Sequence, residues 1–216
     1  MIALIGLRSN SKRIENKNIK DFCGKPLCYW ILNKANKCEK IEKIYVLVDC
    51  ENYKGIVESF GFDKVEILFE KTIRENGNVN LPYQFIIDFP EIQFDSLCLL
   101  QAPCPFVNLD SAINNFLIEG KDSQLSVYRL KRFFWYDYGY PKNYKIYERP
   151  NTQDLEGELI EIGDCYITTK KNLIRNKNFL GGNIGLFEEP EYCMFEIDNE
   201  EDWAIMESIN KRLNLL

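Results

Sequence analysis

Cationic and small polar side chains are concentrated in one short stretch near the N-terminus. The relevant residues are Arg8, Ser9, Asn10, Ser11, Lys12, Arg13, Asn16, Lys17 and Asn18. Lysine and arginine pair with phosphate oxygens, and hydroxyl and amide groups add further hydrogen-bond donors. The stretch is therefore a candidate site for an anion such as a triphosphate. It lacks the glycine spacing of a Walker loop or a dinucleotide fingerprint, so a solvated basic loop is an equal alternative.

Acidic side chains form a second cluster near the C-terminus, in the run Phe195-Glu-Ile-Asp-Asn-Glu-Glu-Asp202. If the first residues of this run are extended, Glu196 and Asp198 project to the same side of the chain. Two carboxylates so placed suit a hard divalent cation such as Mg²⁺, held against phosphate oxygens. The alternative is helix capping, because acids in a first turn complement the helix dipole. Taken alone the run favours capping, which applies at least to residues 199–202.

Composition narrows the chemistry further. The 216 residues contain no histidine, which excludes Ser-His-Asp and Cys-His nucleophile systems, histidine-ligated zinc and imidazole acid–base catalysis. Proton transfer must use carboxylate, Lys, Tyr or Cys groups, a metal-bound oxygen or the substrate itself. The formal net charge of −6 argues against a general nucleic-acid-binding surface. The eight cysteines include no Cys-x-x-Cys pair, so we expect reduced, mostly buried thiols.

A scaffold for these residues is indicated by alternating patterns along the chain. Apolar runs of strand length at 1–6, 44–48, 64–69, 96–101 and 165–168 are interspersed with helical patterns at 26–37, 51–60, 81–89, 110–118, 170–176 and 202–213. This order predicts an α/β fold with a mainly parallel sheet. Ligands of such sheets bind beyond the carboxyl ends of the strands. The residues expected there are Arg8, Ser11, Lys12, Asp49 and Gln101.

The alternation stops between residues 124 and 149, where aromatic residues are interleaved with charges. Six of the nine residues from Arg132 to Tyr140 are aromatic. Such a segment is too apolar to stand in water, so we predict an arm at about 124–155 that forms a homodimer interface, with a stacking surface for a ligand as the alternative. The sequence as a whole indicates a single domain over 1–216, with this arm as part of it. No run approaches the roughly 20 apolar residues of a membrane helix, and Met1 leads directly into an apolar strand, so we expect a cytoplasmic protein.

The stretch from Ile5 to Leu27 resembles the opening signature of the CMP-sialic acid synthetases, the acylneuraminate cytidylyltransferases. That signature reads Ala-Arg-Gly-Gly-Ser-Lys, then Lys-Asn and Gly-Lys-Pro-Leu. The residues that match it in register are Arg8, Ser11, Lys12, Lys17, Asn18, Gly24, Lys25, Pro26 and Leu27. Segments 99–105, 153–155, 179–182 and 195–198 are similar to further motifs of the family, so the resemblance covers essentially the whole chain.

The resemblance implies a three-layer, Rossmann-like nucleotidyltransferase core with an aromatic-rich β arm, and a homodimer. It also implies transfer of CMP from CTP to a 2-keto acid sugar, a sialic or related nonulosonic acid, with release of pyrophosphate and help from Mg²⁺. By position, Arg8, Lys12 and Lys17 would be catalytic, and Glu196 and Asp198 would bind the metal. Further nucleotide contacts would be Leu7, Ser9, Asn10, Ser11, Asn18 and Asp49. The acceptor would face Gln101, Gln153, Asp154, Phe179, Gly181 and Gly182.

Three departures from the family pattern remove expected features. Ser9-Asn10 replaces paired glycines, Leu47-Val48 replaces a hydroxyl pair before Asp49, and Ile162 replaces an asparagine before Gly163. The last two remove polar groups from the expected nucleotide and sugar faces. Two alternatives therefore stay open: a nucleotidyltransferase for another acidic sugar of the legionaminic, pseudaminic or octulosonic type, and a nucleotide-binding homologue without activity.

Overall fold

Buried apolar strands build the centre of the molecule, which a computed structural model describes over residues 1–70 and 80–216. Ile2–Leu7 (β1) pairs in parallel with Lys43–Val48 (β4) on one side and with Ser96–Leu100 (β6) on the other. Val65–Phe69 (β5) adds a further parallel strand next to β4. Nearly every side chain of β1 is buried, as expected for a parallel sheet that is covered on both faces.

The sheet continues beyond β6 through Glu158–Thr169 (β8), Ser123–Leu130 (β7) and Ile184–Glu188 (β9), in the order β5-β4-β1-β6-β8-β7-β9. Only β8 runs against its neighbours, because it pairs antiparallel with β6 and β7 while β7 and β9 pair in parallel. The predicted mainly parallel sheet is thus confirmed. β9 was not predicted, since Gly185 interrupts its apolar pattern and its outer side chains are exposed.

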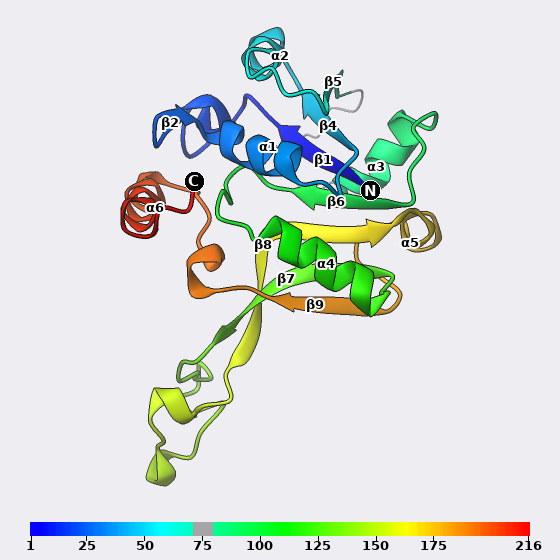
Figure 1. The fold of residues 1–216 in the computed structure, drawn as a ribbon. Helices are drawn as coiled ribbons and strands as arrows, with labels where there is room; N and C mark the ends of the chain where they lie inside the picture. Colours follow the sequence, from blue (N-terminus) through cyan, green and yellow to red (C-terminus); the bar gives the residue numbers. More distant parts are fainter. Residues whose placement is uncertain (71–79) are drawn as a thin grey trace.

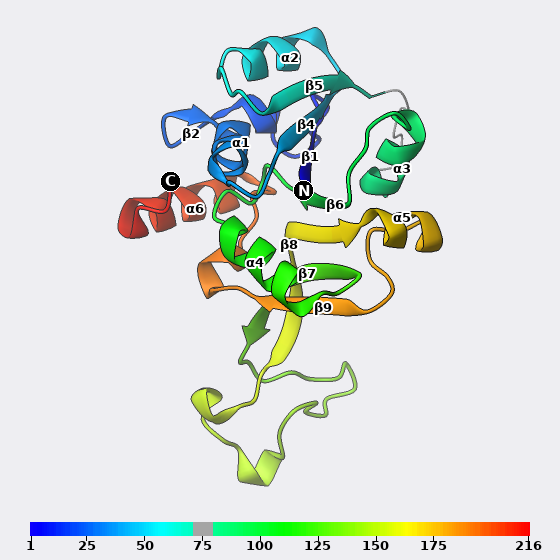
Figure 2. The same ribbon diagram turned by 45° about the vertical axis from the view of Figure 1, so that its right-hand side comes forward.

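Helices cover both faces of this sheet (Figures 1 and 2). Leu27–Lys37 (α1), Glu51–Glu58 (α2) and Leu109–Glu119 (α4) pack on the face that carries Ala3 and Ile5. Leu81–Asp88 (α3) packs on the face of Ile2 and Leu4, with Lys170–Asn176 (α5) beside it. Alternate residues of β1 therefore supply two cores, which confirms the three-layer architecture. Within residues 1–70 and 80–216, no helix has the length and apolarity to cross a membrane.

A third core joins the two ends of the chain beside the sheet. The closing helix, Glu200–Leu213 (α6), packs its Trp203 edge-on against Phe22, with ring centroids 5.5 Å apart. Phe22 belongs to a small hairpin of Asp21–Phe22 (β2) and Lys25–Pro26 (β3). This packing holds the segment before α6 next to the polar loop that follows β1.

The segment between β7 and β8 leaves the body of the molecule as an arm (Figures 1 and 2). It contains two short 3₁₀ turns, Ile146–Glu148 (η2) and Thr152–Asp154 (η3), and one isolated bridge between Trp135 and Pro141. The arm starts later than the predicted residue 124, because the first half of β7 is buried within the sheet. Its strand structure is limited to the extended base that β7 and β8 share.

Candidate functional site

A cavity of about 630 Å³ opens at the carboxyl ends of β1 and β6. Its lining residues are Gly6, Arg8, Lys17, Asn18, Asn80, Leu81, Leu99, Leu100, Gln101, Ala102, Pro103, Tyr166, Asn178, Phe179 and Leu180. Charged and amide side chains thus meet apolar walls, a combination typical of small-molecule sites. The position agrees with the rule that parallel sheets bind ligands beyond the carboxyl ends of their strands.

The loop after β1 is tied to the end of β4 by one side chain. Both carboxylate oxygens of Asp49 accept from the Ser9 backbone N–H, at 2.9 and 3.1 Å, and the Ser9 hydroxyl donates to Asp49 at 3.0 Å. Asn18, which is buried, donates from Nδ2 to the Arg8 carbonyl at 3.1 Å. Ser9, Asn18 and Asp49, which were predicted as nucleotide contacts, form these bonds within the loop, and Asn18 also lines the cavity. A glycine in place of Ser9 could donate its backbone N–H to Asp49 but would lack the hydroxyl that donates the additional bond.

Free cations and donors remain on the outer part of this loop. Arg8 lines the cavity and Lys12 is exposed, and neither forms an ion pair within the described residues. Asn10 is exposed and Ser11 is half-buried, with its N–H donating to the Ser9 carbonyl at 3.1 Å. Leu7, in contrast, is fully buried in the core. The loop therefore offers Arg8, Lys12 and the Ser11 hydroxyl to an anion, but not the side chain of Leu7.

Lys17 reaches from the N-terminal loop to the acidic segment before α6. Its ammonium group donates to the Ile197 carbonyl at 2.7 Å and to Asp198 Oδ1 at 3.3 Å. Arg13 pairs with the same Asp198 oxygen at 2.8 Å. Lys17 was predicted as a triphosphate ligand, and it lines the cavity, but its contacts in this structure hold the carboxylate segment in place.

Glu196 and Asp198 lie side by side, as the alternation of an extended segment predicts. Glu196 remains accessible to solvent, yet partial desolvation and then the charge and proximity of Asp198 raise the pKa of its carboxyl group. A cation that binds both oxygens would relieve this repulsion. Two neighbouring carboxylates that open toward solvent match the oxygen ligands that Mg²⁺ prefers, so the residues present fit the expected metal.

Gly163 of β8 brings Gln101 next to the carboxylate pair. A Cβ atom at Gly163 would stand 3.4 Å from Glu196 Oε2 and 3.9 Å from Gln101 Nε2. The Ile197 N–H also donates to the Pro103 carbonyl at 3.0 Å, which ties the acidic segment to the turn after β6. Gln101, Glu196 and Asp198 are thus assembled around one point at the cavity edge.

The departures at Leu47, Val48 and Ile162 fall in the interior. All three side chains are buried: Leu47 and Val48 in the two cores that flank the sheet, and Ile162 beside Trp203 in the third core. None of them lines the cavity. An apolar residue at these positions therefore adds buried surface and leaves the cavity wall unchanged.

Four of the predicted acceptor residues do not line the cavity. Gln153 and Asp154 lie on the arm, where the Gln153 carbonyl accepts from Lys131 and Asp154 Oδ2 accepts from Asn151, both at 3.1 Å. Gly181 exchanges backbone hydrogen bonds with the Ser123 hydroxyl. Gly182 has φ of +65° and abuts Asp122. Of the predicted segment 179–182, Phe179 and Leu180 line the cavity.

Tyr166 is a cavity residue that the sequence did not indicate. Its ring meets Phe179 edge-on, with centroids 4.9 Å apart, and its hydroxyl donates to Glu161 at 2.6 Å. Burial, followed by this bond to Glu161, raises the pKa of Tyr166. A tyrosine within an apolar strand pattern does not by itself indicate a binding site. The sequence feature that could have indicated one is Glu161, an acidic residue five positions earlier in the same strand, next to a bulge in the β7–β8 pairing.

The fold and the site together define a nucleotidyltransferase-like α/β protein. The solved structure of a CMP:2-keto-3-deoxy-manno-octonic acid synthetase complexed with CTP has a TM-score of 0.70 at 13% identity, covering 98% of each chain. Because the identity is so low, this likeness concerns the fold. It confirms the predicted Rossmann-like fold.

Sequence comparisons carry the identification further. Residues 2–81 match the family model described as cytidylyltransferase. The chain is 31% identical over 217 residues to an N-acylneuraminate cytidylyltransferase of Oncorhynchus mykiss, covering 95% of this chain and 49% of the relative. It is 24% identical to a CMP-N,N'-diacetyllegionaminic acid synthase of Legionella pneumophila, covering 97% and 95% of the two chains. The chain is therefore similar to acylneuraminate cytidylyltransferases over 95% of its own length, and it spans about half the length of the first of these relatives.

The structure predicts that Gly182 acts through the backbone and that its replacement is costly. An alanine there must adopt a left-handed conformation and place its Cβ about 2.5 Å from Asp122 Oδ2. Gly61 is a matched control, since it has the same φ of +65° and open space around it. We expect Gly61→Ala to lower the free energy of unfolding by about 1 kcal/mol and Gly182→Ala to lower it by clearly more, in urea denaturation. Equal losses would show that the contact with Asp122 is relieved without cost.

Proposed function

We propose that this chain is a CTP-dependent cytidylyltransferase that transfers CMP to a hydroxyl group of an acidic 2-keto sugar and releases pyrophosphate. The observation that carries the proposal is that a cavity lined by Arg8, Lys17 and Gln101 borders the Glu196–Asp198 pair, since Lys17 donates to Asp198 and Gln101 lies near Glu196. The match of residues 2–81 to the cytidylyltransferase family model supports CTP as the nucleotide. Two features favour a cytoplasmic location in this proposal: the use of CTP as a substrate, and the presence of eight free thiols.

Nucleotidyl transfer places few covalent demands on protein side chains, so a chain without histidine can perform it. Rate enhancement comes from holding the nucleophile in line with the α-phosphorus and from stabilising charge on the leaving pyrophosphate. In our proposal Arg8 and Lys12 pair with the phosphate oxygens. Asp49 and Asn18 hold the backbone that carries Arg8, and Gln101 orients the acceptor through its exposed amide.

Glu196 and Asp198 are the residues that would hold Mg²⁺ in this proposal. Bound there, the ion would offset negative charge on phosphate oxygens. Lys17 and Arg13 position Asp198 from the loop side, since both reach its Oδ1 atom. The Pro103 carbonyl fixes the intervening Ile197. The chain thus controls the direction in which both carboxylates point.

An acceptor of nonulosonic acid type agrees with the relatives, whose printed names cover N-acylneuraminate and N,N'-diacetyllegionaminate. The first relative is more identical, whereas the second matches this chain over almost the full length of both. Phe179 and Tyr166 form an aromatic wall that suits the apolar face of a sugar ring. We propose that this wall receives the acceptor.

The direct test is pyrophosphate release by the purified chain with Mg²⁺ and CTP. The assay is run with N-acetylneuraminic, N,N'-diacetyllegionaminic, pseudaminic and octulosonic acids, and the CMP-sugar is identified by mass spectrometry. We expect release with CTP and at least one of these acids, and little with ATP, GTP or UTP. Nucleotide binding without release for any acid would instead support the inactive-homologue alternative.

The two unpaired cations of the loop should matter for turnover and not for folding. We expect Arg8→Ala or Lys12→Ala to lower kcat/KM for CTP by about 100-fold or more. The melting temperature should stay within a few degrees, because Arg8 is half-buried and Lys12 exposed, and neither forms an ion pair within residues 1–70 and 80–216. Lys40→Ala, an exposed lysine in the turn between α1 and β4, is the control and should behave as the unaltered chain. Full activity of both loop variants would refute the assignment of this loop to the triphosphate.

Asp198 and Asp202 should have different roles, one in metal binding and the other in stability, although they are only four residues apart. Asp202 Oδ2 accepts from the backbone N–H groups of Asp198 and Asn199, at 2.9 and 3.0 Å, in a capping box at the start of α6. We expect Asp198→Asn to abolish Mg²⁺-dependent release, and Asp202→Asn to retain activity while losing about 0.3–1 kcal/mol of unfolding free energy. A magnesium titration with parallel thermal melts measures both. An unchanged magnesium response in Asp198→Asn would contradict the metal assignment.

We also propose that the arm mediates a homodimer. Trp135, Tyr136, Tyr138 and Tyr140 are 44–73% exposed in one chain, and the three tyrosine rings contact one another in sequence, so they form a contiguous apolar patch of the kind that marks protein interfaces. Gln153 and Asp154 sit on the same arm, so they could meet an acceptor only at the cavity of a second copy. This dimer would reconcile their predicted role with their position.

Light scattering at micromolar concentration tests the arm. We expect about twice the chain mass of 25.4 kDa, and a shift to monomer in the double variant Tyr138→Asp/Tyr140→Asp. The control is Ile118→Asp, which alters an exposed apolar side chain on α4 that is 85% exposed. If the unaltered chain is a monomer, the aromatic segment serves another purpose.

A further inference from the structure

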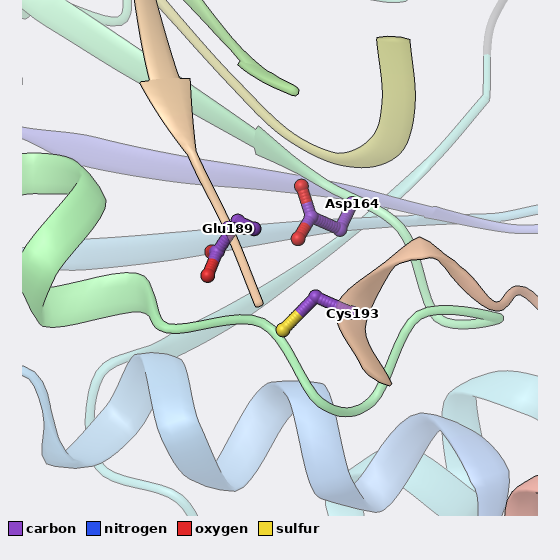
Figure 3. A group of neighbouring side chains, drawn as sticks. All are labelled: Asp164, Glu189 and Cys193. Carbon is purple, nitrogen blue, oxygen red and sulfur yellow. The ribbon is translucent and has the colours of Figure 1, made fainter. Parts of the chain in front are cut away.

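Three metal-ligating side chains from separate segments meet in the interior, behind the candidate active site (Figure 3). Asp164 comes from β8, Glu189 follows the last residue of β9, and Cys193 lies in the 3₁₀ turn Glu191–Met194 (η4). One ligand atom of each lies within 4.8 Å of those of the other two. All three residues are buried, unlike an ordinary cluster of surface acids.

Asp164 has no partner to balance its carboxylate. Its side chain is fully buried, and neither oxygen has a hydrogen-bond partner within the described residues. The nearby Ser126 hydroxyl donates a long bond to the Cys165 carbonyl, at 3.5 Å, and its proximity to Asp164 only partly offsets the rise in the pKa of Asp164 that burial causes. Figure 3 shows the Asp164 carboxylate directed toward the space between Glu189 and Cys193. Burying an unpaired carboxylate is expensive, so its charge must be compensated either by a proton or by a bound cation.

The charges around the cluster leave one negative charge, which a divalent cation or a proton on Asp164 would compensate. Lys34 of α1 is a nearby cation that interacts electrostatically with all three residues. Its ammonium group donates to the Val107 carbonyl at 3.2 Å. With Asp164 and Glu189 ionised and Cys193 as a thiol, the cluster and Lys34 together carry a charge of −1. A divalent ion bound to two carboxylates and a thiolate brings the sum to zero.

We propose that Asp164, Glu189 and Cys193 bind a structural transition-metal ion, and specifically Zn²⁺. A thiolate sulfur with carboxylate oxygens suits zinc and is disfavoured by Mg²⁺, which takes oxygen ligands. Zinc–ligand bonds of about 2.0–2.3 Å give tetrahedral edges of about 3.5 Å, which modest side-chain rotations reach from the present spacing. Asn108 touches Glu189 Oε2 from Nδ2 at 2.6 Å and Cys193 Sγ at 3.7 Å, so rotation of its amide would present Oδ1 as a fourth ligand.

The ion would stabilise the position of the segment that carries Glu196 and Asp198. Asp164 directly follows Gly163, which abuts Glu196, and its carbonyl accepts from the Gln101 N–H at 3.3 Å. Cys193 stands three residues before Glu196 in the chain. The metal would therefore cross-link β8, the end of β9 and η4, the three segments on whose positions the carboxylate pair depends. This role is distinct from that of the Mg²⁺ proposed at Glu196 and Asp198.

A proton on Asp164 is the competing explanation, because burial, and then the negative charge of Glu189, raises the pKa of the Asp164 carboxyl group to about 7. This proton is not shared with Glu189, whose oxygens accept from Asn108. The two explanations predict opposite effects of Asp164→Asn. Losing a metal ligand removes stabilisation by zinc, whereas replacing an unpaired buried acid with its neutral isostere raises stability at neutral pH.

The test uses the full chain, stripped with a chelator and then titrated with Zn²⁺ or Co²⁺. We expect about one Zn²⁺ per chain by elemental analysis after gel filtration, and a melting temperature raised by about 10 °C with zinc in large excess over its Kd. The Co²⁺ form should show thiolate-to-metal charge-transfer absorption and the ligand-field bands of a tetrahedral site. Neither readout involves nucleotide or acceptor, so the result is independent of the proposed enzymatic activity.

Matched variants assign the ligands. Cys193→Ser should lose the charge-transfer band, and Asp164→Asn should lose the zinc-dependent rise in melting temperature while keeping its circular dichroism spectrum. Cys98→Ser is the control. Cys98 is another buried thiol, 3.4 Å from the sulfur of Cys165, and this pair of thiols could itself bind a soft metal. The proposal is overturned if the unaltered chain takes up no zinc, if the band survives in Cys193→Ser and disappears in Cys98→Ser, or if Asp164→Asn melts higher than the unaltered chain with zinc present.

Discussion

The ammonium group of Lys17 joins two parts of the chain that are 180 residues apart. It donates to the Ile197 carbonyl and to Asp198, and its side chain is only 14% exposed. A buried ammonium requires such partners, so the loop after β1 and the segment before α6 must be placed together. The third core, with Trp203 against Phe22, supplies the apolar surface that makes this placement stable. Arg8 and the carboxylate pair can face one cavity because of it.

The sheet supplies the second half of this arrangement. Parallel pairing puts the ends of β1, β4 and β6 at one edge, so residues 8, 49 and 101 become neighbours. The antiparallel β8 enters the same region from the opposite direction, and Gly163 leaves room there for Glu196 and Gln101. A side chain at residue 163 would occupy the space in which those two groups meet. The site therefore depends on one reversed strand as well as on the parallel ones.

Much of this could be predicted from sequence, because the informative signals are local. Continuous apolar runs and helical spacing gave β1, α1 and β4 within a residue or two, and the alternation of an extended segment placed Glu196 beside Asp198. The long-range roles were not predictable. Asp49 reads as a free acid after a strand, yet its oxygens are used by Ser9, forty residues away. Asp164, Glu189 and Cys193 each look ordinary in sequence, since only folding brings them together.

A crystal structure of the chain with CTP and Mn²⁺ in place of Mg²⁺ tests the central claim most directly. Anomalous scattering would locate the metal without ambiguity. The account predicts a Mn²⁺ ion bound by both Glu196 and Asp198 and by phosphate oxygens, with the triphosphate against Arg8 and Lys12 in the cavity at the ends of β1 and β6. Triphosphate bound elsewhere, or Mn²⁺ at the CTP phosphates with neither carboxylate as a ligand, would contradict it.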